Sequence, residues 1–207
     1  MVKKSVKKYD TGFTSGALLL NEATAVIENI NDIESFMSGE EGVDLNTIPT
    51  NSESSKKRLK SELEKRIRAI GDSSLISMYL GLNEQNRKLV LFYAACKMYP
   101  LISDFMIMKV LKKWHALDMK VSSEDFLNFL YEKSGAHPEL QEITDNTRYK
   151  LAQVMMKMLK DLGLLKNGEL TEISFELSAV DAIVSNGDIW FLEVVLMAKN
   201  EINNLLK

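Results

Sequence analysis

The sequence has a single cysteine, Cys96, and only two histidines, His115 and His137, among its 207 residues. A lone cysteine cannot form an intramolecular disulfide, which favours a reducing compartment. A structural zinc ion takes four Cys or His ligands, more than this chain holds. The composition therefore predicts neither a disulfide framework nor a structural zinc site.

Long apolar runs are also missing. The longest unbroken one, Leu89–Cys96, has eight residues, whereas a membrane-spanning helix needs about 20. The opening MVKKSVKKYD is basic but lacks the apolar stretch of a secretion signal. Three prolines and ten glycines argue against long linkers. We expect no membrane contact.

Catalytic signatures are absent as well. The sequence contains no GxxxxGK[ST] loop, GxGxxG turn, HExxH pair or GxSxG elbow. His115 follows Trp114 near a predicted helix end, and His137 precedes Pro138 at a predicted turn. Neither position is typical of acid–base chemistry, so we expect no enzymatic activity and no cofactor.

What the sequence does have is charge in blocks. Residues 1–8 carry four lysines and no acid, and residues 9–55 carry nine acids and no Lys or Arg. Residues 56–160 hold 19 basic and 12 acidic side chains, and residues 161–207 hold 3 and 8. A net charge of −3 is thus compatible with a basic face that binds nucleic acid or an acidic partner. The blocks can equally cancel if the segments interleave in space.

Apolar residues recur at the helical period through most of the chain. Leu59, Leu63, Ile67 and Ile70 fall on one side of a helix that Gly71 would end. Residues 15–118 show almost no period-2 alternation, which indicates an all-helical half. The helices predicted there cover residues 15–37, 52–70, 73–80, 84–98 and 101–115.

The region 119–177 carries a more specific pattern. Ser122 and Asp125 form a capping box ahead of a helix that runs to about Lys133. Pro138 is suited to the first turn of a short helix ending near residue 143. A longer third helix is predicted over residues 146–162, closed by Gly163.

A hairpin follows the third helix. Asn167-Gly168 lies between two strand-like runs, residues 164–166 and 170–175, and this dipeptide favours a two-residue turn because both positions take positive φ. Helix, short helix, longer helix and hairpin are the order of a winged helix-turn-helix. The predicted fold is therefore all-α, mainly helical, with a winged helix-turn-helix and one small β-hairpin wing.

The third helix has two distinct faces. Leu151, Met155, Met158 and Leu162 fall in a narrow sector. The opposite side has amides, a phenol and three lysines with no acid near its centre: Asn146, Tyr149, Lys150, Gln153, Lys157 and Lys160. Amides can read adenine edges and lysines can reach guanine or phosphate.

In a helix-turn-helix this face would enter the major groove of duplex DNA. Lys166 and Asn167 in the wing would contact phosphates or the minor groove. Taken alone, the same pattern fits a solvated amphipathic helix; its place in the element order favours DNA contact.

Other basic clusters point less clearly to a site. The run over residues 56–68 is interleaved with Glu62 and Glu64, which stand at i, i+4 spacing to Arg66 and Arg68. A solvated helix face is predicted there, and a second phosphate-binding surface stays open. The same applies to three lysines on the helix 101–115: Lys109, Lys112 and Lys113.

The C-terminal stretch 188–206 is predicted to be one helix, apolar on most sides from Ile189 to Ala198. A helix with apolar residues on most sides is buried in the core or against a partner. We expect its residues to be buried against the helical half or a second subunit, in particular Trp190, Phe191, Val194 and Val195.

Several short motifs resemble the BrxA family of BREX bacteriophage-defence systems: Thr11–Leu19 followed by Glu22, Tyr99–Phe105, Arg148, and the ending Leu162–Leu165. The resemblance spans about residues 9–206. It implies a cytoplasmic, non-enzymatic protein that is encoded beside a methyltransferase and large ATPase components and binds DNA through helix-turn-helix modules. An older description of the family as inner-membrane proteins disagrees with the short apolar runs of this chain.

Two functions follow as alternatives. One is a DNA-binding component of the defence system; the other is a helical scaffold that holds other BREX components without touching DNA. RNA binding by the helical half is a third, less supported option. The predicted organisation is an N-terminal helical domain (1–118) that could hold a second helix-turn-helix-like module, the winged helix-turn-helix (119–177), and a C-terminal segment packing on the core (178–207). Oligomeric state, the partner contacted and DNA sequence preference stay open.

Overall fold

The computed structural model describes residues 8–206, so most of the basic block 1–8 and Lys207 lie outside the described residues. The chain is mainly helical, and its described part contains one two-stranded sheet. The N-terminal half contains η1 (Gly12–Ser15), α1 (Leu20–Ile27), α2 (Ile33–Ser38), η2 (Leu45–Thr47), α3 (Glu53–Ala69), α4 (Ser73–Tyr79) and α5 (Glu84–Met98). The remainder contains α6 (Pro100–Phe105), η3 (Met106–Val110), α7 (Leu111–His115), α8 (Ser123–Ser134), α9 (Pro138–Gln141), α10 (Asp145–Leu162), β1 (Leu165–Lys166), β2 (Glu169–Leu170), α11 (Leu177–Ser185), α12 (Trp190–Val194) and α13 (Lys199–Leu205).

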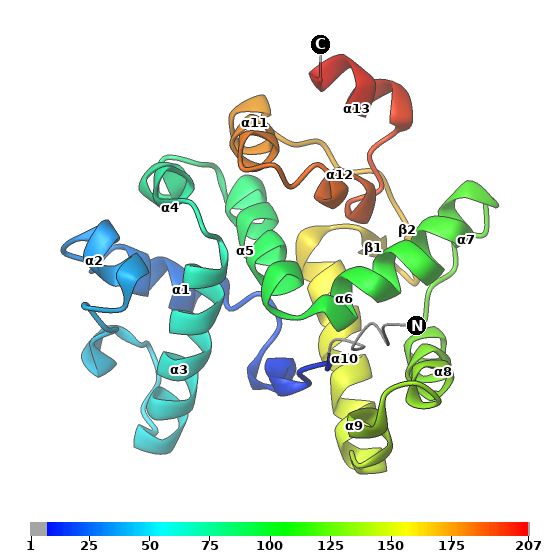
Figure 1. Ribbon diagram of the computed structural model, residues 1–207, viewed down its shortest axis with the longest axis horizontal. Coiled ribbons are helices and arrows are strands. Elements are labelled where there is room, and N and C mark those ends of the chain that lie inside the picture. The colour runs from blue at the N-terminus through cyan, green and yellow to red at the C-terminus, as the bar shows by residue number, and fades with distance from the viewer. Residues whose placement is uncertain (1–7, 207) are drawn as a thin grey trace, which may run out of the picture.

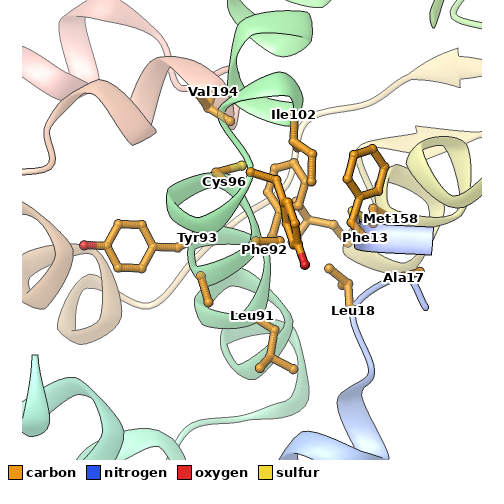
Figure 2. Close-up of a cluster of buried hydrophobic side chains, with 14 of the residues drawn as sticks. Phe13, Ala17, Leu18, Leu91, Phe92, Tyr93, Cys96, Ile102, Met158 and Val194 are labelled. Carbon is orange, nitrogen blue, oxygen red and sulfur yellow. The ribbon is translucent and has the colours of Figure 1, made fainter. Parts of the chain in front are cut away.

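Helix α5 lies at the centre of the molecule, with α3 on one flank and α6 and α10 on the other (Figure 1). Its apolar run 89–96 is buried along its whole length. Figure 2 shows side chains of the N-terminal segment, α6, α10 and α12 gathered around it: Phe13, Ala17, Leu18, Ile102, Met158 and Val194. A helix enclosed on all sides needs no polar face, which explains why this stretch reads as continuously apolar.

Three of the predicted helices of the first half are confirmed, and the structure shows a side-chain cap at the start of each. Ser52 caps α3, Asp72 caps α4 and Asn83 caps α5, each through a side-chain oxygen that accepts a backbone N–H of the first turn. Gly71 follows α3 at φ +73°, a left-handed conformation that glycine adopts without strain.

The single helix predicted over residues 15–37 is wrong. The chain forms η1, α1 and α2 there, separated by Leu19 at φ +57° and by a turn before Asp32. Both breaks have tertiary partners: Arg66 of α3 donates to the carbonyls of Gly16 and Ala17, and the Glu41 carboxylate accepts the Asp32 N–H at 2.9 Å. Periodicity along the chain carries no signal of such partners.

The helix predicted over residues 101–115 is present but not regular. It consists of α6, the π-helical turn η3 and α7, which follow each other without a gap. No single helix within residues 8–206 combines the length and apolarity needed to cross a bilayer. Helix α5 and the run Pro100–His115 meet those criteria only together, as a pair bent by 102°.

The single C-terminal helix predicted over residues 188–206 is also wrong. Helix α12 ends at Val194, Leu196 adopts φ +61°, and α13 starts at Lys199. Phe191, Val194 and Leu196 are all buried, and Trp190 is half-buried. A straight helix would carry part of this apolar stretch into water, whereas the turn buries both sides of it.

The hairpin is shorter than predicted. Asn167 and Gly168 have positive φ (53° and 83°), as expected, but the strands pair only Leu165 with Leu170 and Lys166 with Glu169. Residues 172–175 are not in a strand. A third segment joins instead: Lys120 forms an antiparallel bridge with Glu169 on the other side of β2.

Candidate nucleic-acid interface

The predicted order of helix, short helix, longer helix and hairpin is present as α8, α9, α10 and β1–β2. The capping box of Ser122 and Asp125 starts α8, and Thr144 caps α10 by accepting the Thr147 N–H at 3.2 Å. Gly163 ends α10 at φ +88°. These local signals fix the length and start of the helix that carries the predicted site.

Most of the circumference of α10 is buried. It packs against α8 on one side and against α5 and η1 on another (Figure 1). Leu151, Met155, Met158 and Leu162 are each 0% exposed, as the helical period predicts. The exposed residues of α10 are Asp145, at its first position, and the six of the sequence prediction, which form one narrow stripe: Asn146, Tyr149, Lys150, Gln153, Lys157 and Lys160.

The stripe is basic but not uniformly so. Within residues 8–206, Lys150 and Lys160 have no ion-pair partner, whereas Lys157 Nζ lies 3.0 Å from Asp161 Oδ1. Lys157 and Asp161 also border a surface hollow with Glu22 and Glu84. Exposed or half-buried acids therefore stand at both ends of α10, Asp145 at its first position and Asp161 near its last, and Lys157 is paired with the second.

The hairpin tip adds one cation and one amide. Lys166 and Asn167 are both exposed, and Lys166 has no ion-pair partner among the described residues. Lys120, in the bridged third segment, is exposed beside the tip and was missed by the sequence analysis, because an isolated bridge leaves no periodic pattern. The tip thus presents Lys120 and Lys166 on the same small sheet.

Lys113 is not available in the same way. Its Nζ lies 3.1 Å from both Asp118 and Asp125, at the start of α8. Burial lowers the pKa of Lys113, but the hydrogen bonds to Asp125 and Asp118 outweigh it and the pKa is raised overall. This lysine ties α7 to α8 rather than facing a ligand.

Arg148 positions the start of α10. It is 7% exposed. Its guanidinium donates to the carbonyl of Leu140, within α9, at 2.5 Å and to the carbonyl of Ile143, which follows α9, at 2.8 Å. Its Cζ lies 5.3 Å from the ring centroid of Tyr131 in α8. One buried side chain therefore joins α8, α9 and α10, and only the resemblance had singled it out.

The N-terminal segment holds α9 from outside. The Tyr9 backbone N–H donates to Glu139 Oε1 at 2.7 Å, its hydroxyl donates to Asp104, and its ring stacks on His137 with centroids 4.1 Å apart. Burial raises the pKa of Glu139, but the hydrogen bonds from the Tyr9 N–H and from His137 lower it by more, so the pKa is lowered overall. His137 is thus part of a docking contact.

Helix α3 differs from its predicted charge pairing. The Glu62–Arg66 pair forms, at 2.5 Å, but is buried. Glu64 pairs with Lys60 at 3.6 Å, and Arg68 donates instead to the carbonyls of Phe36 and Glu41. The acids of α3 are thereby used internally, and three exposed side chains of this helix have no ion-pair partner in the described part of the chain: Lys57, Arg58 and Lys65.

Within residues 8–206, no three or more His, Cys, Asp or Glu side chains lie close enough together to form a metal site. Cys96 is fully buried, and burial raises the pKa of its thiol well above the ordinary value. A thiol in that state is not nucleophilic.

Comparison with known proteins decides the family. Residues 7–187 match the family model described as BrxA. The chain belongs to the BrxA family. A curated relative, "BREX protein BrxA" of Bacillus cereus (strain H3081.97), is 26% identical over 201 residues, which covers 95% of this chain and 99% of the relative. The crystal structure of an uncharacterized protein from Magnetospirillum magneticum shares the fold of this BrxA-family chain with a TM-score of 0.71 at 17% identity, over 91% of this chain and 98% of that one.

Proposed function

We propose that this BrxA-family protein is a DNA-binding component of a BREX phage-defence system and that its region 119–177 acts as a winged helix-turn-helix on duplex DNA. Family membership and the name of the Bacillus cereus relative support the defence role. The order α8, α9, α10, hairpin, with a third segment bridged at Lys120, supports the winged-helix interpretation.

The exposed stripe of α10 is the observation on which the proposal rests. When a helix is buried on most sides, only the residues that do not pack against neighbouring elements are accessible to a ligand. Here these residues are two amides, a phenol and three lysines, with one exposed acid, Asp145, at the start of the helix, and neither Lys150 nor Lys160 has an ion-pair partner among the described residues. A stripe of this composition matches phosphate oxygens and base edges.

The stripe and the hairpin would divide the work. Lys150 and Lys160 would bind phosphates, Asn146 and Gln153 would face base edges, and Lys166 with Asn167 would contact the backbone beside the groove. Lys157 would contribute less, because Asp161 already holds it. Arg148 would act through position, by fixing the turn that aims the first residues of α10.

The protein would contribute binding, not chemistry. We propose that it has no catalytic activity and no cofactor of its own and that other BREX components are its partners. Duplex DNA and these proteins would then bind to different surfaces, because the acidic and apolar C-terminal region 178–206 repels phosphate.

A scaffold without DNA contact is the alternative, and one observation favours it. Leu117 and Leu177 are 79% and 65% exposed, and exposed apolar side chains of this size suit protein contact more than DNA. Under this alternative the α10 stripe would be a solvated face.

Fluorescence anisotropy with a short labelled duplex, titrated at two salt concentrations, distinguishes the two. DNA binding through about four to six phosphates predicts that log K falls against log salt with a slope of about −4 to −5. The variant Lys150→Glu with Lys160→Glu should abolish most of this binding, and Lys199→Glu, in α13, is the matched control. Absence of binding at low salt would leave the scaffold function.

A further inference from the structure

Residues 172–175 have the pattern of a strand without a strand partner. Ile173 and Phe175 are half-buried, whereas Glu172 and Ser174 are exposed, so the side chains alternate as in an extended chain. Within the described part of the protein, no backbone N–H or C=O of these four residues takes part in a hydrogen bond. The segment leaves β2 and runs to α11 (Figure 1).

The backbone on both sides of this segment is paired. Before it, the Thr171 N–H donates to the Leu164 carbonyl at 3.0 Å; after it, the Glu176 N–H donates to Asn86 Oδ1 at 3.0 Å. The unpaired stretch is therefore a bounded edge of four residues, held at both ends. Unpaired strand edges are templates for another chain.

The same segment forms one wall of a pocket of about 470 Å³. The pocket is also lined by Trp114 of α7, Val180 of α11, the turn 195–198 and Leu205 of α13. Leu177 lines the pocket while 65% exposed, so the pocket opens to solvent at this leucine. Its volume suits one or two apolar side chains of a bound molecule.

The pocket is acidic at its margins. Glu172 and Glu201 line it, and Glu172 has no ion-pair partner among residues 8–206. Residues 167–206 contain seven acids and one cation, Lys199. Such a surface attracts cationic side chains and repels phosphate.

We propose that this edge and pocket bind an extended, lysine- or arginine-bearing segment of a partner protein by strand addition. The backbone of the incoming segment would pair with residues 172–175, one of its apolar side chains would enter the pocket beside Leu177, and a flanking cation would meet Glu172. Backbone pairing supplies affinity, and the alternating pocket and carboxylate supply specificity. The run of four unpaired residues favours a peptide over a small apolar molecule, which would leave the backbone groups unused.

A labelled ten-residue peptide of alternating valine and lysine is a suitable probe, and two N-methylated forms of it test the geometry. A strand adds through one edge only, so N-methyl groups on every second residue block pairing in one register and spare it in the other. We expect fluorescence anisotropy to detect binding of the parent peptide and of one methylated form, with at least tenfold weaker binding of the other. Equal affinity of both forms would overturn strand addition.

Two protein variants test the side-chain contacts, each with a matched control. Leu177→Ser should weaken peptide binding at least tenfold while Leu80→Ser, an exposed leucine after α4, leaves it unchanged. Glu172→Lys should also weaken peptide binding at least tenfold. Glu193→Lys, which changes an exposed glutamate of α12 outside the pocket, should leave peptide binding unchanged. Circular dichroism melts of all four establish that they fold.

Amide hydrogen exchange gives an independent readout. Bound parent peptide should slow exchange of part of the 172–175 amides, and duplex DNA should not. Unchanged exchange with saturating peptide would overturn the proposal. A second outcome would also overturn it: if a variant that lacks residues 1–7 binds the peptide tenfold more tightly, the chain's own basic segment is the occupant of this edge.

Discussion

Lys157 and Asp161 form an ion pair across one turn of α10, with Nζ and Oδ1 3.0 Å apart, at the end of the exposed stripe. The two side chains are 66% and 31% exposed. A pair this exposed stabilises the helix by less than about 1 kcal/mol. Its larger consequence is for DNA, because the carboxylate neutralises one of the three lysines of the stripe.

Asp161→Asn should therefore strengthen DNA binding. The substitution frees Lys157 and removes a charge that repels phosphate, so we expect affinity for duplex DNA to rise about two- to fivefold at low salt, within the range of exposed ion pairs. Anisotropy titrations measure it, and Glu193→Gln, which removes a carboxylate far along the chain in α12, is the control. A weaker complex with Asp161→Asn would contradict this role of the pair.

Lys150→Glu should weaken binding to every DNA sequence and flatten the salt dependence, because a phosphate contact is lost. Gln153→Ala should have an effect only on a preferred sequence, since amides act on base edges. Competition assays with two unrelated duplexes separate these outcomes. If Lys150→Glu and Lys160→Glu together leave binding intact, the α3 face with Lys57, Arg58 and Lys65 becomes the site.

The buried pair of Arg66 and Glu62 should be essential for the fold of the N-terminal half. Arg66 is 2% exposed and donates to Glu62 and to the carbonyls of Gly16 and Ala17. Arg66→Met leaves Glu62 buried without its cation, which should lower the free energy of unfolding by about 3–5 kcal/mol. Urea denaturation measures this loss, and the exposed Arg58→Met should change stability by less than about 0.5 kcal/mol.

Phe191→Ala should destabilise the protein although it lies near the C-terminus. The ring is fully buried and meets the rings of Phe92 (6.1 Å between centroids) and Tyr93 (5.1 Å) of α5. Removing it should lower the free energy of unfolding by about 3–5 kcal/mol. A thermal melt identical to that of the wild type would show that α12 is peripheral; Leu206→Ala, at an exposed position, is the control.

Asp188 should make stability sensitive to acid. Burial raises its pKa, but hydrogen bonds from Tyr93, Lys97 and Trp190 lower it more, so the pKa is lowered overall from the ordinary 3.8. A lowered pKa in the folded state means that the stabilisation is present above pH 3.8 and is lost as the pH falls through the folded-state pKa. Asp188→Asn should reduce stability at pH 7 and leave a shallower decline below pH 4, which denaturation at both pH values measures.

Capping and turn residues carried most of the correct predictions. Ser52, Asn83 and Ser122 start helices where expected, and Asn167-Gly168 forms the turn of the hairpin. Each of these signals acts within four residues, so the surroundings hardly alter it. The exposed stripe of α10 could be predicted for a similar reason, because a strong 3.6-residue period assigns the faces before any neighbour is known.

The errors fall where distant segments intervene. The pattern of residues 15–37 predicted one helix, but both of its breaks are held by residues outside that stretch. Arg66 lies 50 residues from Gly16, and Glu41 lies nine residues from Asp32. The strand-like run 170–175 is paired only at its start, at Leu170 and Thr171, and the backbone of residues 172–175 makes no hydrogen bond within the described residues. The ion pair predicted between Glu64 and Arg68 is absent because Arg68 donates to the carbonyls of Phe36 and Glu41 instead. Lys60 likewise donates to the Val43 carbonyl.

By itself the sequence determined the helical class, the starts of the capped helices α3, α5, α8 and α10, and which side of α10 is polar, since all of these depend on interactions between residues close in the chain. Only the tertiary structure decided which charges remain unpaired, as at Lys150 and Lys65, and where a buried arginine or an open strand edge lies. Those properties depend on which distant groups arrive within about 4 Å of a side chain, the reach of an ion pair, and no local pattern encodes that arrival.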